Sequence, residues 1–108
     1  MKVLLGPYNN DTRTVEIQID KYDTYSVDHT LSLIIVPLLI QLRDTNHGYP
    51  SNLNEKSWID IQNKMIWSFE QIRDESQWDI PADEWEEYNA KVQEGLDLFA
   101  KYFRSLWN

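Results

Sequence analysis

The chain contains no cysteine, which excludes disulfide bonds, thiolate metal sites and thiol nucleophiles. Its 108 residues include only three glycines, and they form no glycine-rich phosphate loop; G-x-S-x-G and H-E-x-x-H motifs are also absent. The two histidines, His29 and His47, fall at opposite ends of one expected helix, about 27 Å apart at 1.5 Å per residue. A single chain therefore cannot bring both to one metal ion. We expect a protein without metal or cofactor that binds rather than catalyses.

Long hydrophobic runs and positive charge are also scarce. The longest apolar stretch, 31–42, is interrupted by three residues that include Pro37, whereas a membrane span needs about 20 apolar residues. Ten Lys and Arg oppose eighteen Asp and Glu, giving a net charge of -8, which disfavours binding to duplex nucleic acid or attachment to a membrane. Nine carboxylates fall within 70–94 against Arg73 and Lys91. This segment is either a solubilising surface or a face that docks on a basic partner.

The length fits one domain over 1–108. Residues 2–5 and 14–20 read as two strands, and the second alternates apolar and polar side chains as a half-buried strand does. Helical periodicity follows over 28–45, or from Ser26, then over 55–75 and from Asp83 almost to the last residue. The first helix is apolar on most faces, which predicts a central position, with a kink at Pro37. Asp83 and Glu86 have capping-box spacing.

These elements predict an α+β fold that is mostly helical: a three-helix core packed against a short N-terminal β-hairpin.

The segment that enters the first helix is a candidate site for a small anion. A helix N-terminus presents free amides and the positive end of a dipole, which favour phosphate groups. Cationic residues near the end of the last helix would complete the site, although they also suit the helix dipole there, and the segment itself could be a capped connection. The ligand-binding candidates are Lys21, Tyr22, Thr24, Tyr25, His29, Thr30, Lys101 and Arg104.

Five tryptophans are many for this length. Trp58 and Trp85 fall on apolar helical stripes, whereas Trp67, Trp78 and Trp107 do not, which predicts a partner surface. Incomplete cover of these rings and of the first helix also predicts a homodimer or a higher homo-oligomer. The residues assigned to the partner surface are Trp67, Trp107, Glu84, Glu86 and Glu87.

Several motifs together resemble a family of uncharacterised small proteins of tailed bacteriophages. They are the opening M-K-V with G-P-Y, the run 19–25 with 28–31, the turn 47–50, the segment 65–70 and the ending 95–107. The chain is compact relative to that family and has Asn46 where the family usually has lysine. The resemblance implies a phage origin and expression in the host cytoplasm, and it carries no activity to transfer.

Three functions follow as expectations. The first is an anti-defence protein that sequesters a small phosphate-bearing signal of the cyclic nucleotide type. The second is an inhibitor that docks its acidic face on a host defence protein, and the third is a structural or assembly component of the virion.

Overall fold

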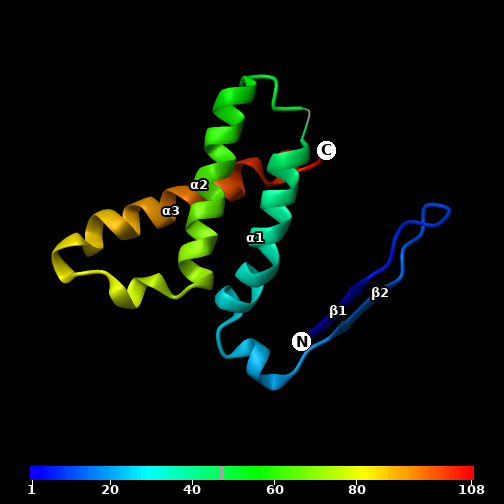
Figure 1. Ribbon diagram of the computed structural model, residues 1–108, viewed down its shortest axis with the longest axis horizontal. Helices are drawn as coiled ribbons and strands as arrows, with labels where there is room; N and C mark the ends of the chain where they lie inside the picture. Colours follow the sequence, from blue (N-terminus) through cyan, green and yellow to red (C-terminus); the bar gives the residue numbers. More distant parts are fainter. Residues whose placement is uncertain (47) are drawn as a thin grey trace.

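The computed structural model describes residues 1–46 and 48–108, and His47 lies outside the described residues. A hairpin of β1 (Lys2–Leu5) and β2 (Val15–Gln18) precedes three α-helices (Figure 1). The helices are α1 (Val27–Thr45), α2 (Glu55–Arg73) and α3 (Trp85–Tyr102), and short 3₁₀ helices occupy Lys21–Thr24 (η1), Ser76–Asp79 (η2), Ala82–Glu84 (η3) and Phe103–Ser105 (η4). The predicted class, α+β with a mostly helical three-helix core, is confirmed. No helix among the described residues is long and apolar enough to span a bilayer.

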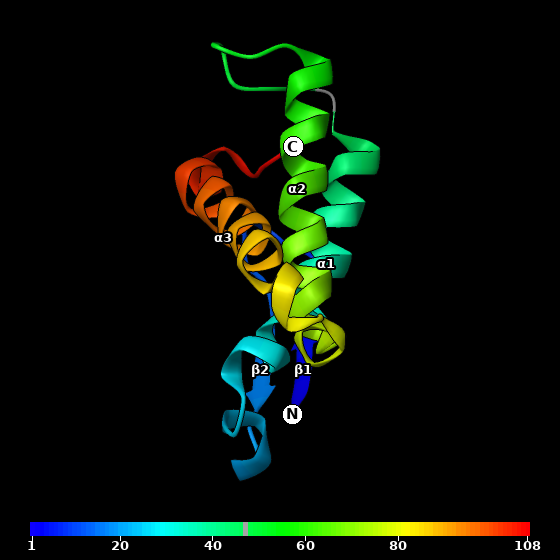
Figure 2. The same cartoon turned by 90° about the vertical axis from the view of Figure 1, so that its left-hand side faces the viewer.

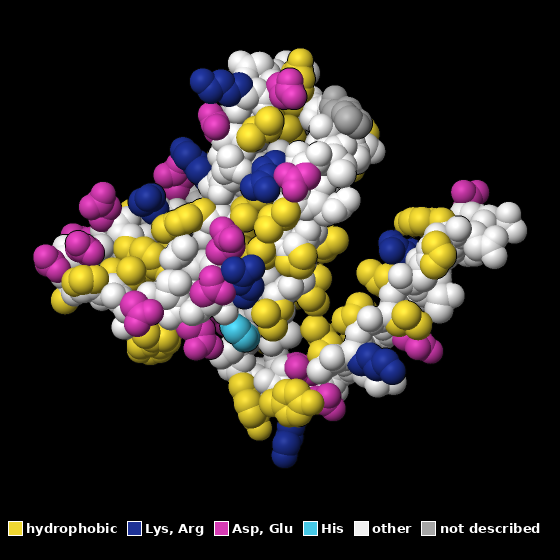
Figure 3. Space-filling view, viewed as in Figure 1, with side chains coloured by type: hydrophobic (Ala, Val, Ile, Leu, Met, Phe, Trp, Pro, Cys, Tyr) yellow, Lys and Arg dark blue, Asp and Glu magenta, His cyan; other side chains and the backbone are white. Residues whose placement is uncertain are grey.

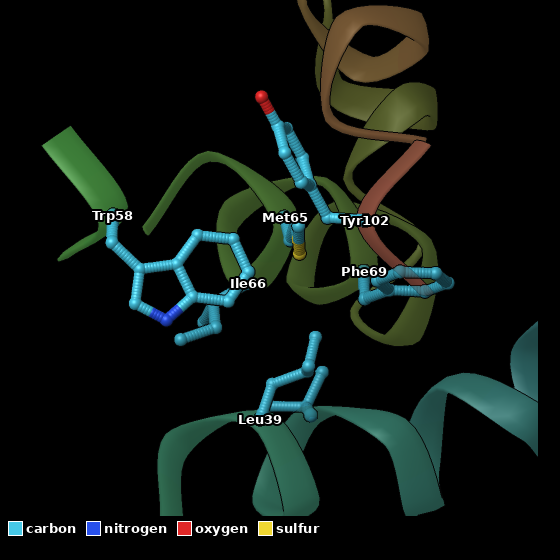
Figure 4. Packing of buried hydrophobic residues seen from close by; sticks show 7 residues of the cluster. Leu39, Trp58, Met65, Ile66, Phe69 and Tyr102 are labelled. Atoms are coloured by element: carbon cyan, nitrogen blue, oxygen red, sulfur yellow. The ribbon is translucent and has the colours of Figure 1, made fainter. Parts of the chain in front are cut away.

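The core lies along α2, which packs against both other helices. Trp58 meets Tyr102 edge to face, with ring centroids 5.5 Å apart, and Phe69 meets Phe99 in the same way at 4.8 Å. Leu39 reaches up from α1 to close the cluster (Figure 4). The buried apolar residues are Val36, Leu39, Trp58, Met65, Ile66, Phe69 and Tyr102.

The sequence prediction that the first helix is central was wrong. Among the helices, α1 packs against α2 and not against α3. Leu31, Leu33 and Leu38 are each about half exposed or more, at 48%, 51% and 63%. A continuous apolar surface thus indicates a helix with an uncovered side as readily as a central one. The helix begins after Ser26, the earlier of the two predicted starts, and continues through Pro37.

The helix starts use capping that differs from the prediction. Asn54 caps α2: its Oδ1 accepts from the Ser57 amide at 2.9 Å, and Ser57 Oγ accepts from the Asn54 amide at 3.0 Å. The predicted capping box at Asp83 was wrong, because η3 takes up that residue and α3 begins at Trp85 without a side-chain cap. Trp85, predicted on a core stripe, is consequently 41% exposed at the start of the helix.

The hairpin stands apart from the helices, so the prediction that the core packs against it was wrong (Figures 1 and 3). Val3 pairs with Ile17 and Leu5 with Val15 in an antiparallel register. Strand alternation places these four side chains on one face, yet each is between 42% and 57% exposed. The apolar alternation that predicted a half-buried strand is present without a covering element within this chain. The molecule is flat, 55 × 42 × 19 Å, as the turned view makes plain (Figure 2).

Candidate functional site

A hollow of about 440 Å³ lies between the end of α1, the following loop and the first half of α2. Trp58 and Gln62 form its most deeply buried wall, with exposed fractions of 2% and 1%. They occupy the same face of α2 because residues four apart lie one above the other on a helix. We call this hollow the α1–α2 pocket; it is lined by Arg43, Asp44, Asn46, Gly48, Tyr49, Glu55, Trp58, Ile59 and Gln62.

Three buried polar atoms of this wall have no hydrogen-bond partner among the described residues: Nε1 of Trp58, and both Nε2 and Oε1 of Gln62. A buried amide or indole N–H left unpaired costs roughly 1–3 kcal/mol each, and most such groups in folded proteins are paired. These two donors and one acceptor are enclosed in the wall of the pocket, and no described residue compensates for their desolvation. A ligand in the pocket would pair with them only after the Trp58 or Gln62 side chain turned these atoms toward it.

The rim of the pocket is polar and carries both signs of charge. The Arg43 guanidinium is held in place because Nε donates to Asp44 Oδ1 and Nη1 donates to Asn63 Oδ1, both at 3.0 Å. Asn46 Oδ1 accepts from the Gly48 amide at 2.6 Å, which fixes the start of the loop. Asp44 and Glu55 place two carboxylates beside one cation. The balance of charge favours a neutral ligand over a multiply charged anion.

Sequence reasoning missed this pocket. Gln62 lies on the apolar stripe of the second predicted helix, within a turn of Trp58 and Met65, and a glutamine at such a position was a readable signal. A polar side chain on a core face needs a partner. The sequence analysis placed the ligand site at a helix N-terminus with nearby cationic side chains instead. The rejection of a metal site shared by His29 and His47 is not tested, because His47 lies outside the described residues.

The predicted ligand-binding segment forms η1 and the start of α1. The polar side chains of Tyr22, Thr24 and Thr30, however, already make hydrogen bonds within this segment. Thr24 Oγ1 donates to the Lys21 carbonyl at 3.0 Å and Thr30 Oγ1 donates to the Asp23 carbonyl at 2.9 Å. Tyr22 donates its hydroxyl to Asp20 Oδ2 at 3.0 Å, and this hydrogen bond raises the pKa of Tyr22. The neighbouring carboxylates of Asp20 and Asp23 oppose an anion here.

The remaining candidates of that set are scattered. His29 Nδ1 lies 3.9 Å from Glu75 Oε1 and makes no hydrogen bond, and Tyr25 is 74% exposed. Lys101 places its ammonium 5.3 Å from the ring centre of its neighbour Tyr102. Among the described elements, η1 makes no close backbone approach to α3 or η4, so Lys101 and Arg104 do not join Lys21 within one chain. A phosphate site that combines Lys21 with Lys101 and Arg104 stays a prediction, and it would need a second copy of the chain.

Part of the predicted partner surface does come together. Trp67, Glu84 and Glu87 line one shallow hollow of about 230 Å³ with Tyr88. The Lys91 ammonium lies 4.8 Å from the centre of the Trp67 ring, and burial raises the pKa of Tyr88. We call this the acidic–aromatic surface; its lining residues are Trp67, Ile80, Glu84, Glu87, Tyr88 and Lys91.

Two other residues of that prediction lie outside this hollow. Glu86 is an exposed neighbour on the first turn of α3, and Trp107 is 73% exposed near the C-terminus, where its carbonyl accepts from Asn46 Nδ2 at 3.5 Å.

No protein-family model, curated protein or solved structure matches the chain. Within the part of the chain that the structure describes, no group of three or more His, Cys, Asp or Glu side chains is placed to hold a metal ion.

Proposed function

We propose that this protein is a non-catalytic binder of a small neutral heteroaromatic molecule, of the nucleobase or nucleoside class, in the α1–α2 pocket. The observation that carries the proposal is the set of unpaired buried atoms on Trp58 and Gln62, at a pocket whose volume is typical of ligand sites. A ligand that pairs with them recovers a desolvation penalty that the folded protein already bears.

The chemistry of the wall selects the class of ligand. Once turned toward the pocket, the Gln62 amide would place a donor and an acceptor side by side, which matches the paired acceptor and donor on the edge of a nucleobase. The Trp58 indole N–H adds a third directional contact, to an acceptor on the same molecule. Tyr49, at 52% exposure on the rim, supplies an aromatic face for stacking.

Charge at the rim argues for a base or nucleoside over a free nucleotide. Two carboxylates, Asp44 and Glu55, would repel phosphate groups, and Arg43 already donates to Asp44 and Asn63. Sequestration of a nucleotide-type signal, the first use expected from the sequence, fits this pocket if the base rather than the phosphate is the part recognised.

Calorimetric titration with adenosine, guanosine, cytidine and uridine tests the proposal. We expect at least one of them to bind, and Gln62→Met to weaken that binding at least tenfold. Gln71→Met is the matched control, because Gln71 lies on the same helix and its amide already pairs with Tyr88. No binding by any of the four, or equal binding by the Gln62→Met variant, would contradict the proposal.

A second candidate function rests on the acidic–aromatic surface. Glu84 and Glu87 flank an apolar and aromatic hollow, a combination that suits a lysine- or arginine-containing segment of another protein. This is the docking function expected from the charge pattern, and it is compatible with a ligand in the α1–α2 pocket because the two sites share no residue.

A further inference from the structure

The chain exposes far more surface than a compact protein of its mass. Its accessible surface is 8235 Å², about 1,900 Å² above the roughly 6,300 Å² expected from the scaling for compact monomers of 12.9 kDa. Its radius of gyration is 16.1 Å, against about 13 Å for a compact domain of this length. A surplus of that size per chain matches the area that an obligate homodimer buries from each subunit.

Two separate apolar surfaces contribute to this exposure. One is the hairpin face made by Val3, Leu5, Val15 and Ile17. A two-stranded hairpin without a covering element is marginally stable in water. The face therefore needs a partner surface of similar character.

The second surface is a groove between the side of α1 and the end of α3, with a volume of about 450 Å³. Leu38 and Phe103 on its walls are 63% and 60% exposed. We call it the α1–α3 groove; its lining residues are Ile35, Leu38, Leu39, Leu42, Phe99, Phe103 and Leu106, all apolar. It shares no residue with the α1–α2 pocket.

The hairpin does not reach its own groove, because the connection between them is ordered. Thr30 Oγ1 donates to the Asp23 carbonyl, and the Asp20 amide donates to Asp23 Oδ2 at 2.8 Å, so η1 is tied to the start of α1. This connection holds the hairpin at a distance from the helices, as the gap between them in Figure 3 makes visible. Folding back onto the same chain would break these bonds.

We propose that two copies of the chain exchange hairpins: the apolar face of each hairpin packs into the α1–α3 groove of the other copy, about a two-fold axis. The contact then forms twice, as a symmetric homodimer requires. It covers both uncovered apolar surfaces at once and lowers the exposed area of each chain.

Sedimentation equilibrium on single-residue variants tests this dimer. The wild type is expected at twice 12.9 kDa in the micromolar range. Val3→Asp in the hairpin and Leu38→Asp in the groove should each halve the mass. Leu4→Asp and Leu33→Asp are the matched controls, because Leu4 is on the opposite hairpin face and Leu33 is on α1 outside the groove; both should stay dimeric. Unchanged helical circular dichroism separates loss of association from loss of fold.

Cysteine cross-linking identifies which surfaces meet, since the chain has no native cysteine to interfere. Ile17→Cys mixed with Leu38→Cys, joined by a flexible bismaleimide, should give a mixed dimer. A wild-type monomer up to 100 µM would overturn the proposal. So would a dimer that survives Leu38→Asp and cross-links Ile17→Cys to itself, because this indicates hairpin-to-hairpin pairing. A chain that carries both Ile17→Cys and Leu38→Cys should not cross-link internally. An internal cross-link at monomer mass would also overturn the proposal.

Discussion

Gly95 of α3 lies directly against Ser68 of α2, so closely that a Cβ at position 95 would overlap the Ser68 hydroxyl. The same Cβ would come within 2.5 Å of the Lys64 carbonyl oxygen, which is backbone and cannot rotate away. Beside this contact, Lys64 Nζ donates to Glu94 Oε1 at 2.6 Å, which raises the pKa of Lys64. The close approach of α2 and α3 therefore requires glycine at position 95.

Gly95→Ala should lower the free energy of unfolding by about 1–3 kcal/mol, the range for overpacking a tight contact. Urea denaturation followed by circular dichroism measures it. Gly48→Ala is the control: the nearest atom to its Cβ is 3.9 Å away, so its effect should stay within about 0.5 kcal/mol. Equal effects from the two substitutions would mean that helix propensity or loop entropy, and not the crossing, limits position 95.

Gln62→Met should raise the free energy of unfolding by about 1–2 kcal/mol, because it replaces an unpaired buried amide with an apolar side chain of similar length. Gln71→Met should lower it, because the Tyr88 hydroxyl loses its acceptor. Thermal unfolding of the two variants gives the comparison. A Gln62→Met protein that is less stable than wild type would show that the amide is satisfied in the native state and would remove the main support for the pocket.

Pro37→Ala should also stabilise the protein, by about 1–3 kcal/mol. Proline inside a helix removes one backbone hydrogen bond, and Pro37 is exposed, so its loss leaves no cavity. Chemical denaturation checks the value. A destabilised variant would indicate that the backbone geometry imposed by this proline sets the fit of α1 against α2.

Lys21→Ala and Arg104→Ala separate the two possible ligand sites. If a nucleoside binds in the α1–α2 pocket, its affinity should be unchanged in both variants, because neither residue lines that pocket. A phosphate site at the start of α1 instead predicts a loss of roughly 1.5–3 kcal/mol for each, the scale of a hydrogen bond to a charged group. Titrating each nucleoside beside its monophosphate against both variants decides between them.

Reversing charge at Glu84 and Glu87 tests the acidic–aromatic surface. The double lysine variant should bind a lysine-rich peptide at least tenfold more weakly than wild type, and added salt should weaken the wild-type complex. Glu16→Lys, on the exposed hairpin, is the control for net charge. If Glu16→Lys weakened peptide binding equally, the effect would come from the overall charge of the chain and not from this surface.

The sequence predicted the elements of this fold better than their packing. Periodicity located the hairpin and all three helices, because strand and helix alternation are local properties of the chain. It misplaced the centre, because α1 is apolar on most faces and yet has an uncovered side, whereas α2 contacts both other helices with a narrower apolar stripe. It also predicted half-buried strands, whereas Val3 and Ile17 form an apolar face that nothing within one chain covers.

The sequence also predicted some parts of the candidate sites and missed others. Trp67, Glu84 and Glu87, which charge and the misfit of Trp67 to the helical stripes had singled out, line one hollow, and their role as a partner surface stays a prediction. Lys21 and Arg104 were joined on chemical grounds alone, and distance within the chain separates them. The place of Gln62 on the apolar stripe was a readable signal, but the α1–α2 pocket also depends on a loop without periodicity, which a sequence pattern does not encode.

The indole N–H signal of Trp58 in a nitrogen–proton correlation spectrum gives the most direct test of the pocket. Among the described residues the Trp58 indole N–H has no partner, whereas Trp78 is 79% exposed in η2 and does not line the pocket, so Trp78 serves as an internal reference. Assignment follows from the signal lost in Trp58→Phe. On titration with the nucleoside that binds best, we predict a saturable downfield shift of the Trp58 signal with no change at Trp78. A Trp58 signal that stays fixed while a nucleoside binds, or that moves no further than Trp78, would contradict ligand recognition in this pocket.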